Sequence, residues 1–587
     1  KLSFYIVIRP YDFEGISPIQ HIQYLQSQAF LINHDLGIIL DKKPDNVVCM
    51  SHKEGDVSEH FNKVEMIFNT TCNYHMASAF AEYKVVIEPQ KSVNFSIKCP
   101  TKTQYLKSFL FQKHISKDRL ESLIHDLKRF SYKSELKQNI FEYKKHLKQL
   151  NSFNVPHDFL TQFITAQQTY MISSIGKNHF IKGVYHRFLH SYLDDIVLFK
   201  ALCQLGYKPA LCEHFFDYHY FQKLYSVLKK NPIHYSLLGT WFTYLKELYN
   251  FGCLSLNEDS HAILSKIIHL AIKKCVYNTE LSVKTCPQRV CSRSGIQSYF
   301  LADNLGLLEI LNHYEYLSRQ LNLPCKIDIS FYKNQSEQAV DDFIESVCIK
   351  TALKDVVPVN MIQYISLDSI VTLLKYSECF PSNKKLYKNT LQLIQQHLLR
   401  NNYIYSFVNP TGYPLKENIL YAQLLLQSDP QAAFKSIENI LSFSSPSFCF
   451  PDAVNPITLG GSDGDGHNIK HAARFIDTFL KCIVLDKGAH VELFKGIPHT
   501  WVDSHSFSLS NILSVFGTFS VSVLQESTTC TQVSIEFTKN RPCDYILMYI
   551  PLSFSSVSIN NKEMNLNHNQ LKLPAQSITF SLIKHDT

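Results

Sequence analysis

The sequence predicts an α+β multidomain protein in which an (α/α)6 toroid lies between an N-terminal and a C-terminal β-sandwich. The chain has 587 residues, more than the roughly 250–300 residues that a single hydrophobic core can use. Apolar residues alternate with a period of two near both ends and recur with a helical period through the middle. The expected parts are residues 1–105, 106–155, 156–487 and 488–587.

The first part has the pattern of a β-sandwich. Short β-branched and aromatic runs at residues 4–8 and 84–87 are separated by turn signals such as residues 12–15. Residues 106–155 then place apolar side chains at helical spacing among lysines, which predicts connecting helices. The apolar run at the start is too short for a signal peptide or a membrane span, and because the first residue is Lys1 we expect the natural chain to begin earlier.

The middle part predicts twelve amphipathic helices. Residues that commonly start or end helices separate them, namely Gly206, Pro232, Pro358, Pro381 and Pro430. Each helix has an apolar stripe that a neighbour must cover, so six hairpins packed side by side in a closed ring would bury all twelve. The helices are expected to begin near residues 157, 189, 208, 236, 259, 299, 334, 366, 383, 417, 430 and 467.

The last part returns to the strand period. After Gly488, alternating apolar runs recur up to residue 550. This length suits a β-sandwich of about a hundred residues.

Composition and motifs exclude several functions. The formal charge of +7 is spread over the chain, and its densest cluster, residues 113–148, also carries acids, so it predicts a solvated helix face and no nucleic-acid partner. No metal-ligand spacing, phosphate loop, nucleophile elbow or dinucleotide fingerprint occurs, so we expect no metal and no cofactor. Sixteen cysteines without a C-x-x-C pair predict reduced thiols, which favours a cytoplasmic location.

Four local motifs, in a fixed order, carry a family resemblance. They are residues 8–19 with 51–57, residues 185–187 with 193–195 and 206–207, residues 450–453 with 459–467, and residues 496–501 with 516–518. Together with the order of the parts, they resemble the bacterial six-hairpin glycosidases, the superfamily of glucoamylases and glycogen-debranching enzymes. The resemblance implies a glycoside hydrolase that inverts a glucan-like oligo- or polysaccharide, with a carbohydrate partner and no membrane.

Inverting hydrolysis needs one protonated and one ionised carboxyl group, about 6.5–9.5 Å apart. By resemblance, Asp452 stands where the family has a glutamate and is the candidate base, while Asp303 or Asp194 is the candidate acid. The alternatives are structural: Asp194 or Asp195 merely caps a helix, and Asp303 is a polar residue at a helix start.

Part of the family's catalytic pattern is missing. Where the relatives carry a Gly-Glu-x-Asp-x-x-Gly segment, this chain has His234 and Ser236 before Gly239. The family's Arg-Asp-Ala triplet is altered to Leu193 followed by two aspartates. A second reading is therefore a catalytically inactive protein that binds a glycan or another protein.

The remaining candidates are expected to bind substrate. A glycine-rich turn presents three of them, although Gly464 and Gly466 could simply take positive φ while Asp465 caps the last helix. Tyr185, Tyr235 and Tyr299 are candidates to stack on sugar rings, and Trp241 is expected in the core. The substrate-binding candidates are Arg187, Asp195, His234, Tyr235, Tyr299, Asp463, Asp465 and His467.

A third reading is a polysaccharide lyase. Such an enzyme would use Tyr and His in place of paired acids, and Tyr235 beside His234 makes it formally possible. Unsaturated products would reveal it.

Overall fold

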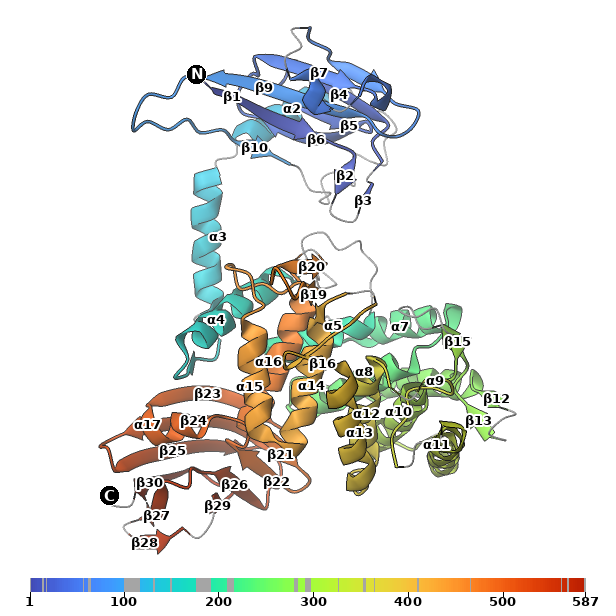
Figure 1. Cartoon of the computed structure of the whole chain (residues 1–587), viewed down its shortest axis with the longest axis vertical. Helices are drawn as coiled ribbons and strands as arrows, with labels where there is room; N and C mark the ends of the chain where they lie inside the picture. Colours follow the sequence, from blue (N-terminus) through green and yellow to red (C-terminus); the bar gives the residue numbers. More distant parts are fainter. Residues whose placement is uncertain are drawn as a thin grey trace. The chain divides into compact units, whose positions relative to one another are not determined.

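The computed structural model shows a multidomain α+β chain that divides into two compact units, Lys1–Lys144 and Lys145–Thr587. The structure describes residues 2–12, 15–16, 18–55, 57–61, 65–99, 117–129, 132–147, 150–175, 192–207, 216–278, 283–290, 297–325, 327–351, 355–363, 365–408, 411–464, 466–560, 562–566 and 569–584 (Figure 1). Among these residues no helix is both long and apolar enough to cross a bilayer.

The first unit contains two antiparallel sheets that share one core. Ile6 and Ala79 of the first sheet and Ile22 and Phe30 of the second belong to the same buried cluster, because alternate side chains point to one face of a strand. Helix α2 (Lys117–Arg129) packs Ile124 against the second sheet, and α3 (Tyr132–Leu147) follows it. The sheets are β1 (Leu2–Ile8), β9 (Ser78–Val85) and β7 (Asn46–Met50), then β10 (Ile97–Lys98), β6 (Asp35–Leu40), β5 (Ala29–Ile32), β4 (His21–Leu25) and β8 (Asn69–Thr71), beside the hairpin β2 (Tyr11–Asp12) and β3 (Gly15–Ile16).

The described residues in the middle of the second unit include twelve helices. Eleven of them begin within five residues of the expected positions. The start expected near residue 208 lies outside the described residues, and the next described helix begins at Tyr218, where Asp217 caps it by accepting the N–H of Tyr220 at 2.8 Å. The twelve helices are α4 (Asp158–Ser173), α5 (Tyr192–Gln204), α7 (Tyr218–Lys230), α8 (Tyr235–Asn250), α9 (Glu258–Lys273), α10 (Leu301–Gln320), α11 (Ile329–Thr351), α12 (Asp368–Cys379), α13 (Lys384–Leu398), α14 (Leu415–Ser428), α15 (Pro430–Leu441) and α16 (Ile469–Ile483).

Six of these helices form a closed series of contacts. Helix α5 contacts α8, α8 contacts α10, α10 contacts α12, α12 contacts α14, α14 contacts α16, and α16 contacts α5 (Figure 1). We call these six the inner helices. The remaining helices alternate with them along the chain and pack against them, for example α11 on α10 and α15 on α14. Covered on several sides, α10 buries 14 of its 20 residues.

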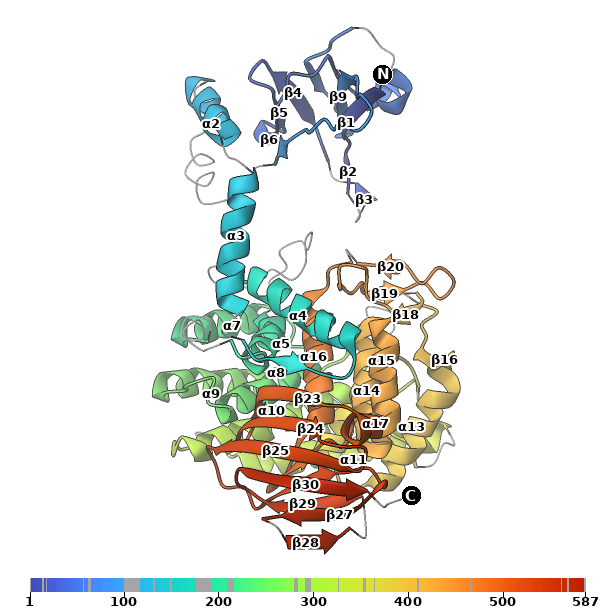
Figure 2. The same ribbon diagram turned by 90° about the vertical axis from the view of Figure 1, so that its left-hand side faces the viewer.

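The last part of the chain builds a seven-stranded and a four-stranded sheet (Figure 2). Burial alternates along β24, where Phe519, Val521 and Val523 are buried. Strand β11, which precedes α4, joins the edge of the larger sheet by pairing Phe153 with Leu509. The larger sheet holds β11 (Phe153–Asn154), β23 (Phe507–Ser514), β24 (Gly517–Gln525), β25 (Cys530–Lys539), β30 (Ile578–Lys584), β27 (Phe554–Ile559) and β28 (Lys562–Asn565), and the smaller one β21 (Val484–Lys487), β22 (His490–Leu493), β26 (Tyr545–Tyr549) and β29 (Gln570–Pro574).

Short sheets connect the helices. One of them, made of β18 (Tyr413–Pro414), β19 (Ala453–Val454) and β20 (Gly461–Asp463), joins the segment before α14 to the segment before α16. It therefore fixes the glycine-rich turn relative to the inner helices.

Candidate functional site

Two cavities lie inside the ring of inner helices. The first, of about 290 Å³, is lined near the starts of four inner helices by His234, Ala302, Asp368 and Lys416. The second, of about 240 Å³, is lined at the ends of inner helices by residues such as Gln427. The amino ends of the inner helices therefore meet at one end of the ring. The cavities share Leu374, Glu378, Gln423 and Lys481, so polar groups line the interior from one end to the other.

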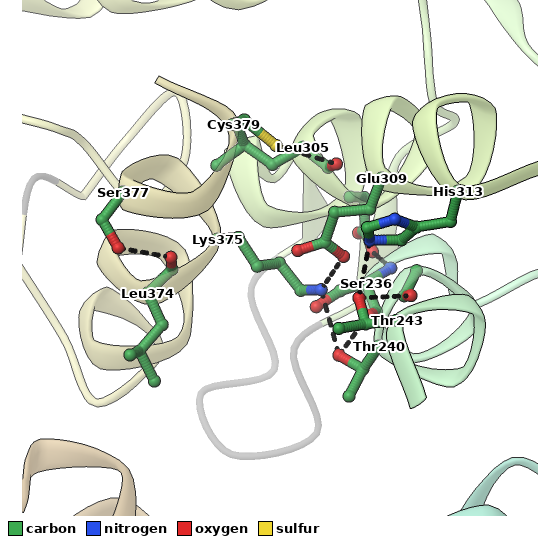
Figure 3. A network of polar contacts seen from close by, with 12 residues as sticks. Ser236, Thr240, Thr243, Leu305, Glu309, His313, Leu374, Lys375, Ser377 and Cys379 are labelled. Atoms are coloured by element: carbon green, nitrogen blue, oxygen red, sulfur yellow. Dashed lines mark hydrogen bonds and ion pairs between the residues drawn. The ribbon is translucent and has the colours of Figure 1, made fainter. Parts of the chain in front are cut away.

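An ion pair crosses the first cavity's wall between α10 and α12. The ammonium of Lys375 contacts the carboxylate of Glu309 and donates to the hydroxyl of Thr240 at 3.0 Å (Figure 3). Burial raises the pKa of Glu309 to about 7, even though the charge of Lys375 lowers it. Deeper in the ring, Glu378 lines both cavities, and desolvation raises the pKa of its carboxyl too.

Asp452 lies at the amino end of the ring. Its carbonyl accepts the N–H of Leu415, the first residue of α14, at 3.0 Å. Its carboxylate contacts two residues at the start of α16: the amide of Asn468, and the Nε2 atom of His471 at 2.9 Å. The polypeptide turn packs tightly here, since a Cβ atom on Gly464 would lie 2.5 Å from the carboxylate.

The surroundings of Asp452 keep it ionised. Burial raises the pKa of its carboxyl, but the hydrogen bond and charge of His471 and the amide of Asn468 outweigh burial and lower the pKa to about 2. Burial lowers the pKa of His471, which is 6% exposed, and the positive charge of Arg474 lowers it further. At neutral pH, Asp452 is thus an anion in contact with the imidazole of His471.

In the glycine-rich turn, Gly464 and Gly466 have the conformation expected if they serve only to form a turn, but the residue that caps the following helix is not the predicted one. Gly464 and Gly466 have φ of 79° and 76°, as expected. The cap of α16 is Asn468, whose side chain accepts the N–H groups of Lys470 and His471, and not Asp465, which lies outside the described residues. Helix α16 begins at Ile469, four residues after the predicted capping position, and the residue that directly precedes a helix is the one placed to accept its first unpaired N–H groups.

Two other turn candidates occupy different environments. Asp463 is exposed and accepts the N–H of Gly464 at 2.9 Å, while its carbonyl accepts the N–H of Asp452 at 3.0 Å. His467 is half-buried just before the capping residue. The turn thus brings both residues near the Asp452 segment.

Asp303 is buried against the neighbouring inner helix. It is 2% exposed, and its carboxylate accepts the backbone N–H of Ser236 at 3.0 Å. Ser236 is in the first turn of α8, so the carboxylate satisfies a helix N–H that has no partner within the helix. Asp303 is not among the residues that line the first cavity in the described part of the chain.

The candidates before and within α5 are less fully described. Arg187 and Tyr185 lie outside the described residues, as does the side chain of Asp194, although the backbone of that residue lies in α5. Asp195 is 2% exposed within the same helix. Since α5 begins at Tyr192, both aspartates follow its first residue.

His234 and Tyr235 are neighbours in sequence but face different surroundings. His234 is exposed, lines the first cavity and makes no capping bond at the start of α8. Tyr235 is 1% exposed, and its hydroxyl donates to the carbonyl of Ala271 at 2.8 Å, so the prediction that it stacks on a sugar is wrong. Trp241 is fully buried, which confirms its expected place in the core. Tyr299 is half-buried and lies outside the cavity lining described here.

Several charged residues of the lining escaped sequence reasoning. Asp368, Lys375 and Glu378 all lie on α12 at spacings of seven and three residues, a helical periodicity that marks one face. In most amphipathic helices such a polar face meets water, so the periodicity alone does not mark these residues as part of a cavity. The other residues missed are Glu309, Lys416, Arg474 and Lys481. Among the residues that the structure describes, no group of three His, Cys, Asp or Glu side chains could hold a metal ion.

His313 predicts a pH dependence of stability. Burial, with the charges of Lys246 and Lys375, lowers the pKa of this residue to about 3, and its Nε2 atom lies 3.1 Å from the hydroxyl of Thr243 (Figure 3). Between that value and the ordinary pKa of about 6.5, the unfolded chain binds a proton that the folded chain does not, so stability falls as pH falls through this window.

The change His313→Gln should flatten this dependence. Both tryptophans, Trp241 and Trp501, are buried in the second unit, so their fluorescence follows its unfolding in urea. From about pH 6.5 to about pH 5 the wild type should lose up to about 2 kcal/mol more than the variant. Parallel curves for the two proteins would contradict the prediction.

The comparisons with known proteins concern the fold. No family model matches the sequence, and no curated protein matches it. Among solved structures, the chain is similar to one described as "Glycosidase Wild Type", with 9% identity, a TM-score of 0.41, and coverage of 55% of this chain and 97% of that one. It is also similar to one described as "Glycoside hydrolase", with 8% identity, a TM-score of 0.32 and coverage of 72% of each chain.

Proposed function

We propose that this chain is a carbohydrate-active protein whose inner helices form an (α/α)6 toroid, and that its first cavity hydrolyses a glycosidic bond in a glucan-like saccharide by inversion. The closed contacts of the inner helices and the motif order support the architecture. The pairs of sheets before and after the helices would then be β-sandwiches, in the division 1–105, 106–155, 156–487 and 488–587.

The observation that carries the proposal is the ionised carboxylate of Asp452. An inverting hydrolase needs such a carboxylate to take a proton from the attacking water. Asp452 is fixed by Asn468 and His471 at the end of the ring where the first cavity lies, outside that cavity's described lining, and its side chain remains 30% exposed. Asp452 is therefore the proposed general base.

The general acid must be a second carboxyl at the same end of the ring. Asp368 fits this place, because it is the first residue of α12 and lines the first cavity. Asp303 and Asp194 remain candidates, but the carboxylate of Asp303 already accepts a hydrogen bond from the backbone N–H of Ser236 and so stabilises the start of α8. We propose Asp368 as the first acid to test.

A second candidate function is glycan binding without cleavage. The engagement of Asp303 and the presence of His234, where the related segment carries a glutamate, favour this reading. The lyase reading has no such support, because burial raises the pKa of Tyr235 strongly and its hydroxyl is bonded to Ala271.

Asp452→Asn tests the proposed function. Incubated with a panel of glucan oligosaccharides and analysed by mass spectrometry, the wild type should release shortened products, and Asp452→Asn should slow release by about 10²–10⁴-fold, the usual contribution of a general base. Glu536→Gln, at an exposed position of β25, should cleave like the wild type.

Other outcomes separate the readings. Equal rates for Asp452→Asn and the wild type would remove Asp452 as the base. Oligosaccharide binding by both proteins without any product would identify a glycan-binding protein.

A further inference from the structure

The first cavity contains an arginine whose charge has no described counter-ion. Arg474 lies on α16, one turn after His471, and lines the cavity. Among the described residues its guanidinium has no hydrogen bond or ion pair. A guanidinium presents five N–H donors that match a carboxylate or a phosphate, so an unpaired one in a cavity is suited to bind an anion.

The other cations of this cavity each have a carboxylate nearby. Lys375 contacts Glu309, Lys481 lies 3.1 Å from Asp477, and Lys416 lies 3.8 Å from Glu417. Arg474 thus differs from these three lysines in having no described carboxylate beside it. Arg474 also lies three residues after His471, the partner of Asp452, on the same helix, and its charge lowers the pKa of that histidine.

Among the residues that the structure describes, the cavity lining presents no free flat surface on which a neutral sugar could stack. Tyr244 is the one aromatic side chain in its described lining; it is 9% exposed, and the ammonium of Lys200 lies 4.6 Å from its ring centre. The described lining therefore offers polar and ionic contacts to a sugar and no free aromatic face. The amino ends of the inner helices at this end of the ring add partial positive charge, which favours an anion.

We propose that the first cavity receives a sugar that carries an acidic group, a carboxylate or a phosphate, and that Arg474 binds this group. The inference rests on the proposed function, since it names the class of sugar for the same site.

Calorimetric titration of the full chain tests the inference. Glucose, glucuronic acid and glucose 6-phosphate serve as probes, so the two acidic sugars separate a carboxylate from a phosphate. At low salt, at least one acidic sugar should bind about tenfold tighter than glucose, and this preference should shrink as salt is added.

Variants at Arg474 connect the preference to this residue. Arg474→Gln should abolish the preference for acidic sugars over glucose, and Arg474→Lys should retain part of it, because lysine keeps the charge but loses the forked geometry. Lys435→Gln, at an exposed position of α15, should behave like the wild type.

Each contrary result has its own meaning. Equal affinity for glucose and both acidic sugars, or an unchanged preference in Arg474→Gln, would overturn this inference and leave the proposed function standing. Failure of all three sugars and of longer glucans to bind would overturn both.

Discussion

Replacing Asp477 with alanine is expected to lower the free energy of unfolding of the second unit by about 3–5 kcal/mol, the usual cost of removing one partner of a buried ion pair. Asp477 is 3% exposed, and its carboxylate lies 2.7 Å from the ammonium of Lys200 and 3.1 Å from that of Lys481. Gln204 also donates to it at 3.0 Å. Without the carboxylate, Lys200, which is 2% exposed, keeps Glu247 as its one anionic partner among the described residues.

Urea unfolding followed by tryptophan fluorescence measures this loss. Lys385→Ala is the control, because the Lys385–Asp355 pair is exposed, and such pairs contribute about 0–1 kcal/mol. A loss below about 1 kcal/mol for Asp477→Ala would show that water reaches the carboxylate and that the inner helices are less tightly closed.

A double change separates the ionic contribution from packing. Lys200→Met with Asp477→Leu replaces both charges with apolar groups of similar size, which is often tolerated in a protein interior. The double variant should therefore lose less stability than the sum of the losses for Lys200→Met and Asp477→Leu made singly. An additive loss would mean that the two residues do not interact.

The helices could be predicted because each one carries its own signals. Asn257 and Asp429, for example, cap α9 and α15 with their side chains, and Pro430 occupies the first turn of α15. These signals depend on a few neighbouring residues, so they can be read without knowing the fold.

The polar interior of the ring could not be predicted in the same way. A helix such as α12 has an apolar stripe and a polar face, and in an ordinary amphipathic helix the polar face meets water. Here Lys375, on that face, is 4% exposed, because six helices close around it. The ring closes through contacts among all six inner helices, so the spacing of apolar and polar residues within one helix cannot predict that its polar face is buried.

The site residues illustrate both cases. The motif containing Asp452 could be recognised, but its partner His471 lies 19 residues later with no spacing that marks the pair. Tyr235, a candidate to stack on a sugar ring, adjoins His234, which lines the first cavity. A helix turns by about 100° per residue, so the two side chains point in different directions, and Tyr235 faces α9.

Gly306→Ala is expected to lower the free energy of unfolding of the second unit by about 3 kcal/mol, at the upper end of the usual cost of overpacking. Helices α8 and α10 approach so closely that a Cβ atom at Gly306 would lie 2.3 Å from the carbonyl oxygen of Tyr235 and 2.8 Å from the Cα atom of Ser236. These are backbone atoms, so the clash can be relieved only by moving the helices apart. That movement would stretch the bond from Ser236 to Asp303.

Gly460→Ala is the matched control for this clash. The nearest atom to a Cβ at Gly460 is the hydroxyl oxygen of Thr458 at 3.6 Å, and the residue does not have positive φ, so its stability should change by less than about 0.5 kcal/mol. Urea unfolding of both variants, followed by tryptophan fluorescence, gives the comparison. If Gly306→Ala were as stable as Gly460→Ala, α8 and α10 would have to lie farther apart, and the wall of the first cavity between Thr240 and Glu309 would be open.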